Sequence, residues 1–283
     1  MKPLGKNILL DAASRFLDES PVNYLDKETA LQPDLAGMRF YDAPLMAVAA
    51  AGDPIFTQLK AGEAVGPLFM TPEEWLPGAQ SVISFFLPFT GRIITANIGK
   101  STDIAAEWLH GRIEGQIAMI AMIENLHSML TDSGYSAVIP ATDERFKSGK
   151  KSDFISRGGE ESPGYTSNWS ERHVAYACGL GTFGLSRGLI TKKGTAGRFT
   201  SIITDLSLEA DVRPYSRYDE YCSLCGECAK MCPAGAIDVK KGKNMAVCAA
   251  FVEECRKKYD PYYGCGKCNV GVQCATGIPG NAK

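Results

Sequence analysis

Apolar residues recur at helical spacing in three parts of the chain. Residues 7–19 place apolar side chains on one face and end just before Pro21, which favours a short amphipathic helix. The longest signal covers residues 102–131, where apolar residues repeat every three or four positions, and Gly134 then fits a helix end. The pattern predicts a third, shorter helix over residues 171–178.

Short apolar runs between these helices predict buried strands. They cover residues 81–86, 135–139, 189–191 and 199–204. The region from 20 to 70 is irregular and rich in proline and glycine apart from one apolar run, Leu45 to Ala51, and the sequence assigns no chemistry to it.

The elements together indicate an α/β (α+β) fold in two domains. We expect the first domain to cover residues 1–205 and the second to cover the cysteine-rich residues 206–283. Residues 206–220 are polar and contain Pro214, so they are predicted to form a linker into the second domain.

The composition is that of an ordinary globular protein, with 45% hydrophobic and 22% charged residues in a chain of 283. The formal net charge of −2 favours neither nucleic acid nor an anionic membrane as a partner. No stretch approaches the ~20 apolar residues that a membrane-spanning helix needs. Since ten cysteines occur without a recognisable secretory signal, we expect a reducing, cytoplasmic location and no membrane partner.

Four cysteines follow one another in residues 222–232 at the spacing Cys-x2-Cys-x2-Cys-x3-Cys, and Pro233 follows directly. The first three wrap one tight turn, so their sulfurs converge, whereas the fourth is directed elsewhere. This is the run found in bacterial ferredoxins, where the fourth cysteine ligates the other cluster of a two-cluster module. A second group is therefore expected downstream, and the chain contains one. The two groups are Cys222, Cys225, Cys228 and Cys232, then Cys248, Cys265, Cys268 and Cys274.

Other uses of cysteine fit this spacing less well. A zinc ribbon needs two separated Cys-x2-Cys knuckles, and four cysteines within eleven residues overcrowd one tetrahedral ion. Disulfide frameworks are typical of short secreted chains. We therefore predict two [4Fe-4S] clusters.

A locally basic region extends from Arg145 to Arg198, with ten Lys or Arg residues against four Asp or Glu. Such a run is usually a solvated face. Its positive charge is equally suited to attracting a phosphate-bearing or otherwise anionic molecule. Both interpretations stay open at this point.

Glycines follow the short helix at the spacing G-x-G-x-x-G. A dinucleotide fingerprint should follow a strand and open a helix, whereas these glycines follow a helix, so we do not expect a Rossmann site. Glycines still allow a flat cofactor face or a phosphate to lie against the backbone. The predicted cofactor-binding residues are Gly179, Gly181, Thr182, Phe183 and Gly184.

The order of these motifs resembles that of epoxyqueuosine reductases. The resemblance is carried by residues 78–83, by the block from Glu171 to Gly184 and by the two cysteine groups, and it covers about residues 75–280. Those enzymes share a cobalamin-binding domain and a two-cluster ferredoxin module with reductive dehalogenases. The resemblance implies a nitroreductase-like cobalamin-binding domain followed by a bacterial ferredoxin-like module. The helical-repeat extension of many of those enzymes, useful for holding tRNA, has no counterpart here.

The resemblance also implies crossed ligation, which agrees with the ferredoxin motif. One cluster would be held by Cys222, Cys225, Cys228 and Cys274, and the other by Cys232, Cys248, Cys265 and Cys268. The end of the second group departs from the family pattern, because five residues separate its last two cysteines and Ala275 replaces a proline. Cys255 is left over, and ligation by Cys255 in place of Cys248 or Cys274 stays open.

The candidate catalytic residues are Tyr165 and Glu171. Epoxyqueuosine reductases carry an aspartate proton donor six residues before the glutamate that matches Glu171, and Tyr165 stands at that position. A tyrosine, with a pKa of about 10, can act as a general acid when a strongly basic group forms beside it, and reductive dehalogenases use a tyrosine for protonation. Alternatively, Tyr165 packs on Trp169, and Glu171 is a first-turn carboxylate favoured by the helix dipole.

These features predict an oxidoreductase in which two clusters pass electrons to a cobalamin that reduces a small substrate. A low-potential donor such as a ferredoxin or flavodoxin would supply the electrons, and the basic region leaves an anionic substrate open. The replaced aspartate and missing extension disfavour tRNA as the substrate. The alternative is an electron-transfer protein that serves a partner enzyme without cobalamin, and a third hypothesis places flavin in the first domain.

Overall fold

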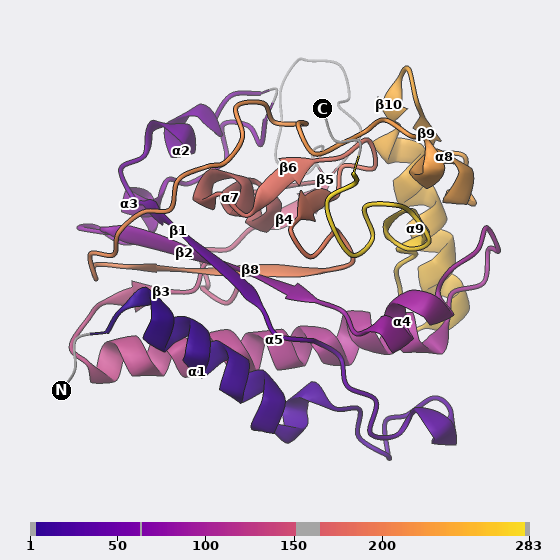
Figure 1. Cartoon of the computed structure of the whole chain (residues 1–283), viewed down its shortest axis with the longest axis horizontal. Coiled ribbons are helices and arrows are strands. Elements are labelled where there is room, and N and C mark those ends of the chain that lie inside the picture. The colour runs from indigo at the N-terminus through magenta and orange to yellow at the C-terminus, as the bar shows by residue number, and fades with distance from the viewer. Residues whose placement is uncertain (1–3, 63, 151–164, 281–283) are drawn as a thin grey trace.

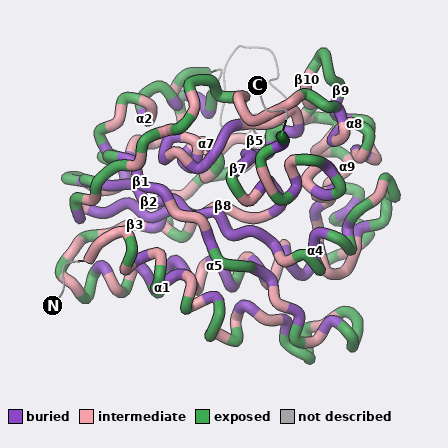
Figure 2. The backbone as a smooth tube through the Cα atoms, viewed as in Figure 1, coloured by how far each residue is buried: buried purple, intermediate pink, exposed green. Residues whose placement is uncertain are grey.

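A four-stranded antiparallel sheet lies at the centre of the computed structural model, which describes residues 4–62, 64–150 and 165–280, with the backbone alone at 150 and 165. The strand order is β1 (Leu45–Ala50), β2 (Ser81–Pro88), β8 (Gly197–Thr204) and β3 (Ala137–Val138). Every residue of β2 is buried, because protein covers both faces of the sheet (Figure 2). Alternate residues of β2 therefore enter two separate cores.

Two long helices cover one face of the sheet, α1 (Lys6–Glu19) and α5 (Ala106–Asp132) (Figure 1). Ile83, Phe85 and Leu87 of β2 share one hydrophobic core with residues of both helices. Alternate residues of β2 therefore pack against the apolar faces of the two helices.

The opposite face is covered by α7 (Glu171–Cys178) and α2 (Pro54–Gln58). Val82 and Phe86 point to this side and pack in a second core with Trp169, which is fully buried just before α7. The sheet thus fixes the start of α7, which carries one of the two predicted catalytic residues.

The remaining elements of the first domain are short. They are η1 (Pro21–Asn23), η2 (Pro33–Leu35), α3 (Pro72–Trp75), α4 (Gly91–Ala96), β4 (Ser148–Lys150), β5 (Tyr165–Ser167), β6 (Gly181–Phe183) and β7 (Leu189–Thr191). The cysteine region adds α8 (Glu227–Met231), β9 (Ile237–Asp238), β10 (Gly242–Lys243), α9 (Met245–Tyr259) and η3 (Lys267–Asn269). The mixed α/β fold with a ferredoxin-like region near the C-terminus is confirmed.

The predicted helices and strands are all present, with differences at their ends. The long helix begins at Ala106 rather than near residue 102, because tertiary contacts use the preceding backbone N–H groups. Ile104 donates to the hydroxyl of Tyr259 at 3.0 Å, and Ala105 donates to Oδ1 of Asn97 at 3.3 Å. The apolar run after residue 44, which had no assignment, forms β1.

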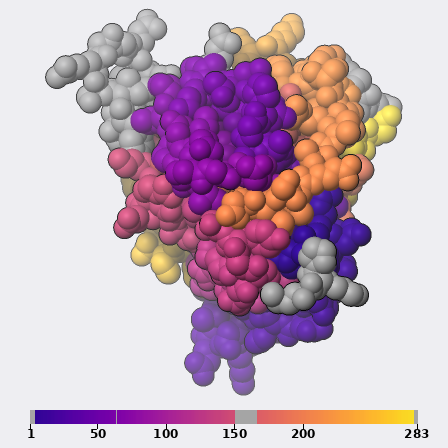
Figure 3. Space-filling view, turned by 90° about the vertical axis from the view of Figure 1, so that its left-hand side faces the viewer, coloured from indigo at the N-terminus to yellow at the C-terminus, as the bar shows by residue number. Residues whose placement is uncertain are grey.

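The segment predicted to be a linker packs along the first domain. The Asp211 carboxylate accepts hydrogen bonds from Lys6 Nζ at 2.6 Å and from Val48 N at 2.8 Å, and Arg213 pairs with Asp53 at 2.7 Å. Figure 3 shows this orange segment lying along the surface between the purple and indigo parts of the chain. The segment is therefore held in place along its length, and the domain boundary after residue 205 stays a prediction.

Residues 264–276 return from the cysteine region and pack on the first domain. The Ala196 N–H donates to the carbonyl of Ala275 at 3.1 Å. A Cβ atom on Gly266 would lie only 1.8 Å from the ring of Trp108. Glycine is thus required where this backbone meets the indole.

Within these described ranges, no helix is both long and apolar enough to cross a membrane. The cytoplasmic location stays a prediction.

Gly266→Ala should weaken the protein more than Gly235→Ala. Both glycines have positive φ, +67° and +61°, so both variants carry backbone strain, but a Cβ on Gly235 has no neighbour within 4 Å. We expect Gly266→Ala to lower the free energy of unfolding by about 1–3 kcal/mol more than its matched control, because it also overpacks the contact with Trp108. Anaerobic urea denaturation of the reconstituted proteins measures the difference. Equal losses in the two variants would contradict this account of the contact.

Candidate functional site

By predicted cluster, the cysteines form two groups: the first is Cys222, Cys225, Cys228 and Cys274, and the second is Cys232, Cys248, Cys265 and Cys268. The first cysteine group lines a single cavity. Cys222, Cys225, Cys228 and Cys274 face it together with residues 184–186, which follow β6. Cys225 is exposed and Cys228 is buried, so the group extends from the surface into the core. Burial first, and then the neighbouring thiols, raise the pKa of Cys228 and of Cys274 to about 12.

The second group comes together around α9 and η3. The thiol of Cys268 lies within electrostatic reach of Cys248 and Cys232, and that of Cys265 lies within reach of Cys268 and Cys232. Burial raises the pKa of Cys268 and raises that of Cys265 to about 12. Cys232 therefore adjoins the downstream cysteines, whereas Cys274 adjoins Cys222 and Cys225. This is the neighbourhood that crossed ligation requires, and the ligand assignment itself stays a prediction.

The surroundings of both groups suit iron–sulfur ligation. Leu185 N donates to Sγ of Cys222 at 3.4 Å, and Ala236 N donates to Sγ of Cys232 at 3.3 Å. Such hydrogen bonds favour the thiolate and tune the potential of a cluster. Among the residues that the structure describes, no three His, Cys, Asp or Glu side chains form a compact site for a single metal ion. The thiols within each group are neighbours, and an all-cysteine donor set fits an iron–sulfur cluster.

Cys255 lies in a different environment from Cys248. It is 3% exposed and belongs to the core shared with α1 and α5, although it is near Cys265. Cys248 instead packs in the small core of the cysteine region with Cys228 and Cys232. The placement favours Cys248 as the ligand.

Glu171 opens α7 and turns its carboxyl group towards the sheet. Oε2 accepts a hydrogen bond from Ser201 Oγ at 2.7 Å, and the same oxygen of Ser201 accepts one from Trp169 Nε1 at 2.9 Å. Oε1 is buried and has no partner among the described atoms. Burial raises the pKa of Glu171 to about 7, and the hydrogen bond from Ser201 only partly opposes this. A carboxyl group in this state can hold or release a proton near neutrality.

Arg172, the next residue, faces the second cysteine group. Its Nη1 donates to the carbonyl of Arg187 at 2.9 Å, and its charge is within electrostatic reach of Cys268 and Cys248. Surrounding protein lowers the pKa of Arg172, although the side chain keeps exposed surface. The guanidinium is thus surrounded by protein groups on one side and reaches solvent on the other.

The glycine-rich segment after α7 has clear packing reasons for two of its glycines. Gly179 ends the helix with φ +99°, and a Cβ on Gly181 would lie 2.0 Å from the carbonyl oxygen of Ile190. Thr182 is fully buried and accepts a hydrogen bond from Tyr221 N at 2.8 Å. The fingerprint-like spacing therefore serves the close pairing of β6 with β7. Cofactor binding by residues 179–184 stays a prediction.

Tyr165 begins β5, where its backbone pairs with Lys150. Its side chain lies outside the part of the chain that the structure describes, as do residues 151–164. The predictions that it acts as an acid or packs on Trp169 therefore both stay open.

The sequence missed several residues of this region. Ser201 and Trp169 anchor Glu171, and Arg112 reaches the cysteine region from α5, where a Cβ on Gly264 would lie 2.4 Å from its side chain. The only sequence signal for a site here was the excess of basic residues between 145 and 198, and Arg112 lies outside that range.

Comparison with known proteins identifies the class of the cysteine region. Residues 216–238 match the model of the 4Fe-4S binding domain. Tetrachloroethene reductive dehalogenases of Desulfitobacterium hafniense and Dehalobacter restrictus are each 36% identical over 90 residues, which is 31% of this chain and 16% of theirs. The C-terminal region is thus a 4Fe-4S binding region, and the chain spans only a small part of the length of these curated relatives.

Solved structures show the fold of the whole chain. A catabolic reductive dehalogenase in complex with 3-bromo-4-hydroxybenzoic acid aligns over 97% of this chain and 37% of its own length, with a TM-score of 0.52 and 12% identity. An epoxyqueuosine reductase with a tRNA stem loop aligns over 83% and 62%, with a TM-score of 0.49 and 19% identity. The predicted resemblance to these two groups of proteins is confirmed, and the fold is that of the dehalogenase.

The raised pKa of Glu171 predicts how the free energy of unfolding depends on pH. The unfolded carboxyl group titrates near 4.5 and the folded one near 7. The protonated carboxyl group therefore contributes its full stabilisation below about pH 4.5, and this contribution is lost as the pH rises through 7. We expect a loss of up to about 3 kcal/mol from this group between pH 4.5 and 8. Anaerobic urea denaturation of the wild type and Glu171→Gln measures it, with exposed Glu19→Gln as control. Parallel pH curves for wild type and Glu171→Gln would contradict the expectation.

Iron content should distinguish Cys248 from Cys255. If Cys248 is the ligand, Cys248→Ala should lose about four of eight irons, because one cluster lacks an anchor, whereas Cys255→Ala should keep about eight. Iron and acid-labile sulfide are measured after anaerobic reconstitution. Loss of about four irons in Cys255→Ala alone would reverse the assignment.

Proposed function

We propose that this chain is a reductase that passes electrons through two [4Fe-4S] clusters to a cobalamin, which reduces a small molecule. The observation that carries the proposal is the position of the second cysteine group beside the start of α7. There, Arg172 faces Cys268 and Cys248, and Glu171 holds a carboxyl group with a pKa of about 7. Electron-carrying ligands and a proton-holding group thus occur on neighbouring surfaces, as a reductase needs.

The two cysteine groups suggest an order for the electron path. Cys225 is exposed and has exposed Leu224 next to it, so the first group is accessible to a donor protein. Both groups contribute to one small core, which keeps them close together. Electrons from a low-potential ferredoxin or flavodoxin would therefore enter at the first group and leave from the second.

Cobalamin, when bound, would supply a cobalt centre of low potential that reduces the substrate. The region beside the second group has features that such a molecule would account for. Glu171 Oε1 is buried and lacks a partner among the described residues, and Arg172 keeps exposed surface. Residues 179–184 would border the cofactor, Tyr165 would donate a proton and Glu171 would hold one nearby.

The substrate we propose is a small organic molecule rather than tRNA. The net charge of −2 provides no general attraction for a polyanion. Tyr165 also stands where epoxyqueuosine reductases have an aspartate. The basic residues of the region are instead suited to one anionic group.

Cofactor analysis of protein purified and reconstituted without oxygen tests this function. We expect about eight irons and eight acid-labile sulfides per chain, together with the absorbance bands of a bound corrinoid. Clusters without a corrinoid would favour an electron-transfer protein serving a partner enzyme, and a flavin spectrum would favour a flavin-dependent reductase. A single zinc ion would overturn the proposal entirely.

A further inference from the structure

Three arginines from three different elements meet beside the second cysteine group. Arg112 comes from α5, Arg172 from α7 and Arg198 from β8. Arg198 donates to the side chain of Gln116, which lies one helical turn from Arg112 on α5. Glu171, next to Arg172, accepts a hydrogen bond from Ser201 on the strand that carries Arg198. In addition to burial, the charges of Arg198 and Arg172 lower the pKa of Arg112. Arg198 likewise opposes the charge of Arg172. We call this group the arginine cluster.

Each guanidinium is held in place by a neutral group. Arg112 lies 4.4 Å above the centre of the Tyr263 ring, Arg198 donates to the side-chain oxygen of Gln116, and Arg172 donates to a backbone carbonyl. These contacts orient the guanidinium groups without neutralising them. The positive charge of the arginine cluster is therefore retained.

No carboxylate in the described part of the chain forms an ion pair with any of the three. Arginines elsewhere do find such partners, as Arg39 does with Asp18 and Arg145 with Asp143. Arg112 Nε is also buried with no hydrogen-bond partner among the described atoms. Gathering like charges and burying a donor both cost free energy, which a bound anion would offset.

The cysteines balance only part of this charge. Cys268 and Cys248 are within electrostatic reach of Arg172, so ligated thiolates there would offset its charge. The groups acting on Arg112 are instead two arginines and the neutral side chain of Tyr263. Arg112 and Arg198 thus keep an excess of positive charge after the clusters are in place.

We propose that the arginine cluster binds a carboxylate or phosphate group of the substrate and thereby orients the molecule beside the second cysteine group. Planar guanidinium groups can each donate two parallel hydrogen bonds to such an oxyanion. That the bound molecule is a substrate rests on the proposed function, whereas the anion site itself rests on these residues alone. It assigns a substrate class, small organic acids or phosphate esters.

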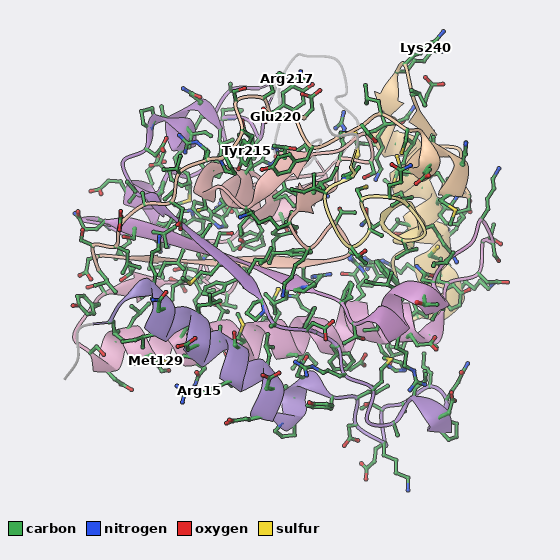
Figure 4. The ribbon with its side chains drawn as sticks, viewed as in Figure 1. Arg15, Met129, Tyr215, Arg217, Glu220 and Lys240 are labelled. Carbon is green, nitrogen blue, oxygen red and sulfur yellow. The ribbon has the colours of Figure 1, made fainter. Side chains whose placement is uncertain are left out.

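Titration calorimetry with inorganic phosphate and, separately, acetate tests the site in the anaerobically reconstituted protein. We expect saturable binding of at least one probe, weakened at least about tenfold in Arg112→Gln and in Arg198→Gln, because each loses a charged hydrogen bond. Arg198→Lys should recover part of the affinity. Arg15→Gln is the matched control, because Arg15 points outwards from α1 (Figure 4) and should bind as the wild type does.

Iron content is measured in every variant, so a folding defect is recognised separately from lost binding. Absence of saturable binding, or unchanged binding in both glutamine variants, overturns the site. A repeat with added cobalamin tests the source of the anion. If cobalamin abolishes phosphate and acetate binding, the arginine cluster holds the cofactor's own phosphate. The proposed substrate class is then wrong, while the proposed function stands. If the probes bind but no corrinoid does, the proposed function fails and the anion site remains.

Discussion

Burial of sulfur is the constraint on which the rest of this structure depends. The core of the cysteine region contains few buried hydrophobic residues, and its buried members include Cys228 and Cys232. A core this small seldom supports a fold by itself, and natural proteins of this kind rely on metal. The raised pKa values of the thiols show how poorly this interior accommodates free thiolates. A bound 4Fe-4S cluster would therefore complete the core of this region as well as carry electrons.

Sequence spacing and tertiary contact contributed differently to what could be predicted. The cysteine spacing and the 3.6-residue period are local properties, so the cluster groups, α1, α5 and α7 followed from the sequence. The arginine cluster could not be predicted, because Arg112 sits in a helix whose pattern is mainly apolar and faces the cysteine region only after Gly264 packs against it. The role of Gly181 was equally hidden, since its spacing resembles a phosphate loop but its contact with Ile190 depends on the fold.

Glu171 and Arg172 show how one helical turn serves two purposes. Adjacent residues on an α-helix point about 100° apart, so the carboxyl group enters the layer between α7 and the sheet while the guanidinium faces the cysteines. Ser201 fixes the first and the Arg187 carbonyl fixes the second. The same short helix thereby places a carboxyl group against the sheet and a cationic guanidinium beside the cysteines.

The backbone hydrogen bonds between residues 195–196 and 274–275 connect a predicted cluster ligand to the central sheet. Cys274 lies at one end of this connection, and β8, which carries Arg198 and Ser201, continues from the other. If the arginine cluster binds an anion as proposed, iron loading and anion binding would be thermodynamically linked. Any free energy that iron adds to anion binding through β8 would then appear, in equal amount, as tighter iron retention when the anion is bound. The scaffold of such a protein would thereby couple the binding of its inorganic and organic ligands.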